Sequence, residues 1–226
     1  MRIHIRGQMG VQILQSFVAI SKLHDDEKPI IVLNTANLKY DGTEKLTQVF
    51  NVKCEIRHQD EIRKTPYWEH GAAELAMASR ERVLRDWLLP KPELITPKLL
   101  NVLHCRGGDK SVASAESYKI LANETRLKID LVVSNDTVLG ETIATHIGAD
   151  FNPQSTAIDD WAMILNAAAV VAAPSAFISS TLMIDPNKII YFAGPRLCDG
   201  PYESTSGDLL FIEEMQQYCP KVKLIK

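Results

Sequence analysis

An apolar run in the middle of the chain ends in side chains that can bind an anion. Leu100, Val102 and Leu103 suit a buried strand, and residues 104–110 (HCRGGDK) follow directly. Adjacent glycines let a backbone turn tightly and let a bulky ligand approach closely. Imidazole and guanidinium groups donate hydrogen bonds to anions, and arginine can do so as a bidentate fork. The segment therefore indicates an anion-binding loop or a polar turn after a core strand.

The elements that position this loop alternate between strand and helix, which favours an α/β fold with mostly parallel sheets. The expected strands are 2–5, 29–33, 53–57, 98–105, 129–134, 168–172 and 188–192. The expected helices are 11–23, 44–50, 74–89, 115–123, 137–147, 158–167 and 209–218, and one more begins within 175–184. Three prolines within 90–97 break regular structure, so we predict two domains, 1–95 and 96–226.

Ligands in open parallel sheets bind at the carboxyl ends of the strands. Small or hydrogen-bonding residues follow four predicted strands, at 6–10 (RGQMG), 104–110, 134–136 (SND) and 174–177 (PSAF). Free backbone N–H groups and the helix dipole favour an anion where such residues lead into a helix. A phosphate-containing ligand is the simplest explanation that the four segments share.

Several common phosphate-binding motifs do not fit. The chain has no GxxxxGK[ST] motif, and 6–10 lacks the third glycine of GxGxxG. A GxSxG nucleophile elbow is absent as well. A cysteine phosphatase would need an arginine six residues after Cys105, but position 111 is serine and Arg106 follows the cysteine directly.

The composition indicates an ordinary soluble globular protein. Of 226 residues, 46% are hydrophobic and 23% charged, and the net charge of −3 suggests neither nucleic acid nor an anionic membrane as a partner. The sequence contains no apolar run long enough to span a bilayer, and its start does not resemble a secretory signal. The four cysteines are far apart, which predicts neither a zinc site nor a disulfide framework. We therefore expect a cytoplasmic protein without a metal site.

Five segments, in order along the chain, resemble motifs of the fucosyltransferase superfamily and above all of its α-1,2-fucosyltransferases. Residues 104–109 (HCRGGD) resemble the HxRRGD motif, with Gly107 in place of the second arginine. The other similar segments are 7–12 (the GxGNQ opening), 117–120 (YYKKAI), 132–136 (the FSDD strand end) and 159–177 (acidic helix, buried strand and SSFS turn). The resemblance covers about residues 1–25 and 100–195.

This resemblance implies a GT-B-like fold, a compact pair of Rossmann-type domains with the acceptor on 1–95 and the nucleotide sugar on 96–226. The implied activity is an inverting, metal-independent transfer of fucose from GDP-fucose to a hydroxyl of a glycan acceptor. No cofactor and no metal is implied. Two alternatives stay open: a GT-B-like transferase that uses another nucleotide sugar, and a catalytically weak module that binds sugar nucleotides.

Four residues carry the expected chemistry. Arg106 is expected to stabilise the charge on the leaving diphosphate, or else to form a surface ion pair. His104 is expected to hydrogen-bond the nucleotide or to be a neutral core histidine. We expect Asp109 to orient Arg106 or the loop backbone. Asp160 is expected to read guanine through its N1–H and 2-amino group, or to complement a helix dipole, and Asp159 is the alternative residue for either role.

The other expected contacts with the donor come from the remaining strand ends. Ser175 and the backbone amides of Ala176 and Phe177 are expected to hold phosphate oxygens. The Phe177 ring is expected to pack near the base or in the core. Further binding residues implied by the resemblance are Gly7, Gly10, Ser134 and Asp136.

Overall fold

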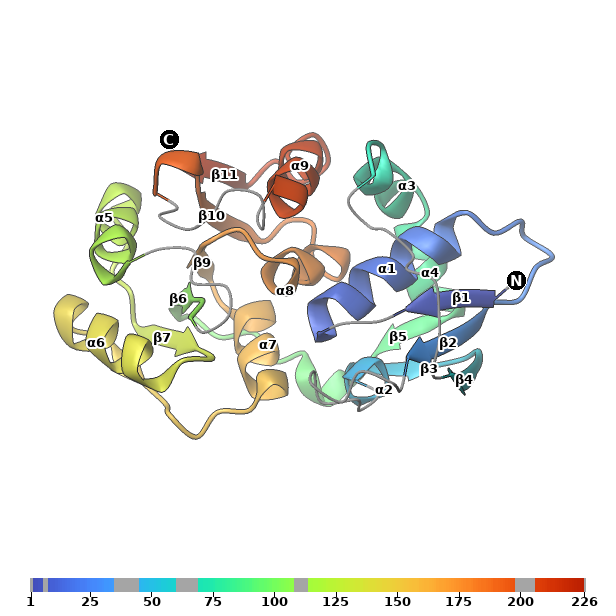
Figure 1. The fold of residues 1–226 in the computed structure, drawn as a ribbon, viewed down its shortest axis with the longest axis horizontal. Helices are drawn as coiled ribbons and strands as arrows, with labels where there is room; N and C mark the ends of the chain where they lie inside the picture. Colours follow the sequence, from blue (N-terminus) through green and yellow to red (C-terminus); the bar gives the residue numbers. More distant parts are fainter. Residues whose placement is uncertain are drawn as a thin grey trace.

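The larger sheet of the protein is six-stranded and lies in the second half of the chain (Figure 1). The computed structural model describes residues 2–5, 8–34, 45–59, 69–107, 114–197 and 206–225. All neighbouring strands of this sheet are parallel. They are β6 (Asn101–Cys105), β7 (Leu131–Ser134), β8 (Asp150–Phe151), β9 (Ala169–Ala172), β10 (Ile189–Ala193) and β11 (Val222–Ile225). The predicted α/β fold with mostly parallel sheets is confirmed.

The strand order places the first and the fourth strand of this sheet side by side. Across the sheet the order is β11-β10-β9-β6-β7-β8, so the chain builds outward from β6 in one direction and from β9 in the other. This is the 3-2-1-4-5-6 order of Rossmann-like folds, which bind ligands where the order reverses, at the carboxyl ends of the strands. Here the reversal lies between β6 and β9, where His104 pairs with Ala172.

Helices cover both faces of the sheet (Figure 1). They are α5 (Ala115–Thr125), α6 (Thr137–Ile147), α7 (Ala157–Asn166), α8 (Ala176–Ser179), η4 (Ser180–Met183), η5 (Pro195–Leu197) and α9 (Ser206–Met215). Successive residues of a strand point to opposite faces. Leu103 and Cys105 belong to the hydrophobic cluster formed with α5 and α6, whereas Val102 belongs to the cluster formed with α7, α8 and α9. His104 therefore lies on the face covered by α8 and α9.

Side-chain caps determine where the helices around the sheet begin. Ser114 Oγ accepts a hydrogen bond from the Ser117 N–H at 3.2 Å at the start of α5. Asp136 Oδ1 accepts one from the Leu139 N–H at 3.0 Å at the start of α6. These caps satisfy backbone donors that have no partner inside the helix. Accordingly, the predicted helices at 115–123 and 137–147 begin at the observed residues.

The first half of the chain forms a separate, three-stranded parallel sheet with the order β1-β2-β4. Its strands are β1 (Arg2–Ile5), β2 (Ile30–Asn34) and β4 (Glu55–Gln59), and β3 (Phe50–Val52) pairs antiparallel with β5 (Leu88–Pro90). The helices of this half are α1 (Met9–Ser21), α2 (Lys45–Val49), α3 (Ala72–Ala78), α4 (Arg80–Asp86) and the 3-10 helix η2 (Pro92–Leu94). Among the described residues, no helix combines the length and the hydrophobicity that a membrane crossing requires.

The predicted helix over 74–89 is wrong in its extent. Ser79 has φ −101° and ψ 0°, so it leaves the helical region and separates α3 from α4. The last residues of the predicted helix form β5, which pairs with β3. Ala76 and Val83 are both fully buried, so the apolar spacing continues across the break. For this reason the spacing alone cannot reveal it.

One hydrophobic core connects the two sheets. The Phe50 ring lies 6.3 Å from Phe17 and 6.4 Å from Trp161, measured between ring centroids. The Trp161 indole N–H donates to Ser180 Oγ at 2.9 Å, which fixes the ring against η4. The predicted boundary at residue 95 falls in the irregular segment between η2 and β6. The division into two domains stays a prediction.

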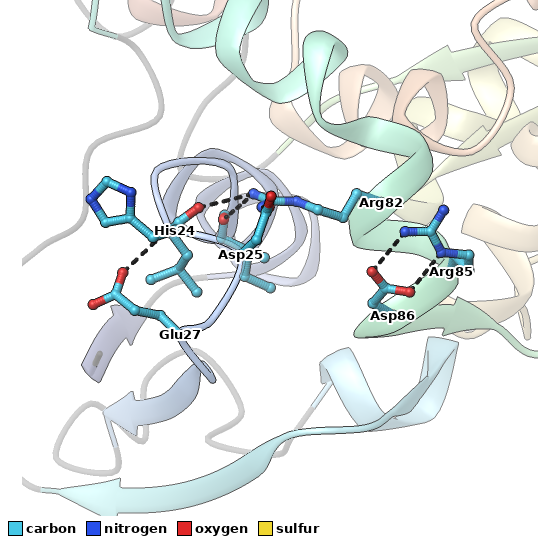
Figure 2. A network of polar contacts seen from close by, with 8 residues as sticks. His24, Asp25, Glu27, Arg82, Arg85 and Asp86 are labelled. Carbon is cyan, nitrogen blue, oxygen red and sulfur yellow. Dashed lines mark hydrogen bonds and ion pairs between the residues drawn. The ribbon is translucent and has the colours of Figure 1, made fainter.

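Polar contacts also join elements on the surface of the first half. Figure 2 shows Arg82 of α4 reaching toward Asp25. The Arg82 Nη2 atom donates to the carbonyl oxygens of Ile20, in the last turn of α1, at 3.4 Å and of Leu23, after the helix, at 3.2 Å. The same guanidinium contacts the Asp25 carboxylate. Because Asp25 is almost fully exposed, we expect this ion pair to add little stability. The Arg82 guanidinium also donates to the Ile20 carbonyl, which already accepts the Leu23 N–H, and to the carbonyl of Leu23 just beyond the helix.

Gly10 marks a close approach of α1 to α8. A Cβ atom at this position would lie 2.4 Å from the Phe177 Cα atom and 2.5 Å from the Phe177 backbone nitrogen. Because backbone atoms cannot rotate away, we expect Gly10→Ala to lower the free energy of unfolding by about 1–3 kcal/mol, despite alanine's higher helix propensity. Chemical denaturation measures the loss. Thr145→Ala, at an exposed position of α6, is the control, and an unchanged Gly10→Ala stability would contradict the close approach.

Candidate functional site

Four side chains, from the end of β6, from α8 and from α9, lie beside the point where the strand order reverses. His104 is in β6, Arg106 follows β6, Phe177 is in α8 after β9, and Asp208 is in the first turn of α9. The His104 and Phe177 rings stack with centroids 5.5 Å apart and planes 26° apart. Arg106 Nη1 lies 3.9 Å from Asp208 Oδ2. We refer to these four residues as the switch-point cluster.

His104 is a buried, neutral member of the switch-point cluster. Only 6% of the residue is exposed, and its Nδ1 atom has no hydrogen-bond partner among the described residues. Burial, and secondarily the Arg106 charge, lowers the pKa of His104 from 6.5 to about 3. The imidazole is therefore uncharged at neutral pH and can give or accept a hydrogen bond without adding charge. The structure thus shows a buried neutral histidine; its predicted contact with a nucleotide stays a prediction.

Arg106 carries the positive charge of the cluster. Arg106 forms an ion pair with Asp208, as the alternative expects, but the two side chains are 14% and 7% exposed, so the pair is largely buried and does not lie on the surface. The distance of 3.9 Å to Asp208 is too long for a hydrogen bond. Within the described part of the chain, no atom accepts a hydrogen bond from the Arg106 guanidinium. Its N–H donors are available to an anionic ligand.

The backbone that carries Arg106 is held by two other residues. The Arg106 N–H donates to the Tyr118 hydroxyl oxygen at 2.8 Å. The Asn135 side chain accepts from the Gly107 N–H at 3.1 Å and donates to the Gly107 carbonyl at 3.2 Å. A Cβ atom on Gly107 would lie 2.4 Å from Asp136 Cβ. Glycine, in place of the second arginine of the HxRRGD motif, is therefore what this contact requires.

Ser134 and Asp136 already have hydrogen-bond partners in the loop after β7. Ser134 Oγ accepts from the Asp136 N–H at 3.1 Å. Asp136 in turn caps α6 through the Leu139 N–H. These contacts give both residues a structural role at the carboxyl edge of the sheet. Their predicted contact with the nucleotide stays a prediction.

The residues after β9 form a short cap instead of an open helix start. Ser175 Oγ accepts from the Phe177 N–H at 3.2 Å, so this amide already has a partner. The α-helical part has four residues and continues as η4. Ala176 is 6% exposed and, with Phe177, lies against Gly10. The geometry thus gives Gly10 a packing role, and the predicted phosphate and ligand contacts of these four residues stay predictions.

Asp159 and Asp160 are adjacent in α7 but have different environments. Asp159 forms a capping box with Thr156, and the hydrogen bonds from Thr156 lower the pKa of the Asp159 carboxyl. Asp160 is 9% exposed, and burial raises its pKa from 3.8 to about 6, despite a hydrogen bond from Ser155. An acid in the first turn of a helix ordinarily gains from the dipole. The raised pKa of Asp160 shows that burial destabilises its ionised form, which is common for carboxylates in functional sites.

Cys105 lies on the opposite face of the sheet from His104. It is fully buried in the hydrophobic cluster with Tyr118 and Leu121, and burial raises the pKa of its thiol well above 9. A nucleophilic cysteine needs a lowered pKa and access to its substrate. The position of Cys105 therefore does not support the cysteine-phosphatase alternative.

Three residues that help to form the site were missed from the sequence. Asp208 carries no local sequence signal that links it to Arg106, because only the packing of α9 brings the two side chains together. Tyr118 lies within the predicted helix at 115–123, and Asn135 within the predicted strand end at 134–136. The sequence predicted the elements that carry Tyr118 and Asn135, but not their hydrogen bonds to Arg106 and Gly107. Of the predicted site residues, Gly7 and Asp109 lie outside the described residues.

Metal-ligating groups and similarity to known proteins are the two remaining kinds of evidence on the site. In the part of the chain that the structure describes, no group of three or more potential metal-ligating side chains is present. The predicted lack of a metal requirement stays a prediction, as does the resemblance to fucosyltransferases. No family model matches the chain, and comparison with curated proteins and with solved structures finds no match either.

Proposed function

We propose that the chain is a metal-independent, inverting glycosyltransferase that transfers fucose from GDP-fucose to a hydroxyl of a glycan acceptor. The observation that carries this proposal is the largely buried Arg106 guanidinium, which lies beside the reversal of the strand order near Asp208 and gives no hydrogen bond to a described residue. A diphosphate would supply both acceptor oxygens and negative charge. The motif resemblance around Arg106 supports a nucleotide sugar as its source.

In the proposed reaction, the acceptor oxygen attacks the anomeric carbon of the sugar while the bond from that carbon to the β-phosphate oxygen breaks. The departing GDP gains negative charge, and the acceptor hydroxyl releases its proton to solvent water. Arg106 would stabilise the charge on the diphosphate through its N–H donors. Since that charge is larger in the transition state than in the bound donor, the stabilisation raises the turnover rate.

The proposal assigns the donor to the second half of the chain and the acceptor to the first, in a GT-B-like arrangement in the cytoplasm. The Rossmann-like strand order supports a nucleotide site in 96–226. Asp160 would accept hydrogen bonds from guanine. It lies in the first turn of α7, which leads from the carboxyl end of β8 toward β9.

The nucleotide preference of the protein tests this proposal directly. We expect GDP to raise the melting temperature more than ADP or UDP does, and to do so in excess EDTA. At a ligand concentration 100-fold above Kd, linkage predicts a stabilisation of about 2.7 kcal/mol. Inorganic phosphate at the same concentration is the control for non-specific anion binding. Equal or absent shifts with all three diphosphates would refute the donor assignment.

A further inference from the structure

Side-chain hydrogen bonds hold the chain after β6 to the chain after β7, beyond the last backbone pair of these two strands. The β6–β7 ladder ends where Cys105 pairs with Ser134. Beyond that pair, the chain after β7 turns into α6, whose cap is Asp136. There the Asn135 carboxamide forms the hydrogen bonds that a backbone peptide would form in the ladder, since it accepts from the Gly107 N–H and donates to the Gly107 carbonyl. A carboxamide offers the same donor and acceptor as a peptide group.

The other side of Arg106 is held from α5. Tyr118 is fully buried, and its hydroxyl oxygen accepts the Arg106 N–H at 2.8 Å. Gly107 packs closely against the cap of α6, since a Cβ atom at this position would lie 2.4 Å from Asp136 Cβ. Three hydrogen bonds and one close contact thus fix the two-residue segment from which the Arg106 side chain extends toward Asp208.

We propose that Asn135 and Tyr118 are positioning residues that hold the backbone of Arg106 and Gly107 so that the Arg106 guanidinium lies in the switch-point cluster. Their function in diphosphate binding rests on the proposed function of Arg106. The Arg106 guanidinium has no hydrogen bond of its own to a described residue, so the backbone determines its location. Small displacements of a group that contacts the reacting atoms reduce rates steeply.

A double-mutant cycle on GDP affinity tests this role. We expect Asn135→Ala to weaken GDP binding about tenfold when Arg106 is present and less than about twofold in the Arg106→Ala background, because residues that act through one another are not additive. Tyr118→Phe, which removes only the hydroxyl, is expected to show the same dependence on Arg106. A residue that only stabilises the fold would give equal losses in both backgrounds, and that result would overturn the proposal.

Asn152→Ala is the matched control. Asn152 Oδ1 accepts a backbone hydrogen bond from Gln154 in the loop after β8, so this variant loses a similar contact away from Arg106. We expect its GDP affinity to equal that of the wild type. A tenfold loss in Asn152→Ala as well would show that any loosened loop weakens binding, and would overturn the specific role of Asn135.

Amide hydrogen exchange separates this proposal from the proposed function. We expect Asn135→Ala to speed exchange of the Gly107 amide, and Tyr118→Phe that of the Arg106 amide, with the rest of the sheet unchanged. The NMR signal of the Arg106 side-chain Nε–H should shift in both variants. If the wild type binds no diphosphate, the proposed function fails, while these signals still test whether Asn135 and Tyr118 hold the backbone of Arg106 and Gly107. Unchanged exchange of the Arg106 and Gly107 amides, together with an unchanged Arg106 Nε–H signal, would overturn the positioning role of Asn135 and Tyr118.

Discussion

Replacing Arg106 with alanine is expected to weaken GDP binding by about one to two decades, because a charge-assisted hydrogen bond contributes roughly 1.5–3 kcal/mol. Turnover should fall further than affinity, since only the transition state carries the full charge of the leaving diphosphate. Isothermal titration with GDP and initial rates with GDP-fucose measure the two effects. Arg106→Lys should recover little, because a point charge does not replace the bidentate fork.

The same substitution is expected to reduce stability as well. Both Arg106 and Asp208 are largely buried, and the alanine variant removes a positive charge that lies 3.9 Å from the Asp208 carboxylate. We expect a loss of about 1–3 kcal/mol in the free energy of unfolding. Binding is therefore compared at a temperature where the variant is fully folded, as judged from its melting curve.

Cys105→Ala distinguishes the arginine from the neighbouring thiol. Cys105 lies in the cluster with α5 and α6, away from Arg106, so its variant should keep near-normal turnover per folded molecule. The reverse pattern, an inactive Cys105→Ala and an active Arg106→Ala, would refute the transferase and favour a thiol nucleophile.

The elements of the second half could be predicted from the sequence because local signals define them. Asp136 caps the start of α6, and Gly148, with φ 70°, ends the helix in the left-handed conformation. Both residue types are strongly preferred at these positions. The predicted range 137–147 is the observed one for this reason. The strands β3 and β8, of three and two residues, carry too little pattern to be predicted.

The meeting of the site residues could not be predicted, because it depends on which strands are neighbours. His104 and Phe177 stack only because β9 lies beside β6, a pairing between distant segments. Asp208 reaches Arg106 only through the packing of α9. The sequence predicted the segments after the strands as candidate binding segments, because Gly, Ser and Asp at these positions can bind a ligand. Their relative placement follows from the strand order.

Substitution of Asp160 by asparagine is expected to stabilise the protein while removing its preference for guanine. Burial raises the pKa of the Asp160 carboxyl to about 6 from its ordinary 3.8. Between these pH values the folded state holds a proton that the unfolded state has lost, so stability falls as pH rises through this range and is constant above it. Asp160→Asn should lack this decline and gain about 1 kcal/mol at pH 7–8, less than the full pKa shift implies because the carboxyl keeps some solvent.

Binding of GDP should depend on the same ionisation. An ionised Asp160 accepts hydrogen bonds from the N1–H and 2-amino groups of guanine, whereas a protonated acid or an amide cannot accept both equally. GDP affinity in the wild type should therefore fall as pH drops through about 6. In Asp160→Asn the affinities for GDP, ADP and UDP should become similar and lose this pH dependence.

Asp159→Asn is the neighbouring control for these measurements. Asp159 belongs to the capping box of α7, so its substitution should cost about 1 kcal/mol of stability without changing the preference for GDP. The pH effect also has the opposite sign. Because hydrogen bonds from Thr156 lower the pKa of Asp159, its contribution to stability is present above its ordinary pKa and is lost as pH falls. An Asp160→Asn variant that keeps the wild-type ratio of GDP to UDP affinity would show that Asp160 does not read the base. The burial of Asp160 would then follow only from the packing of α7.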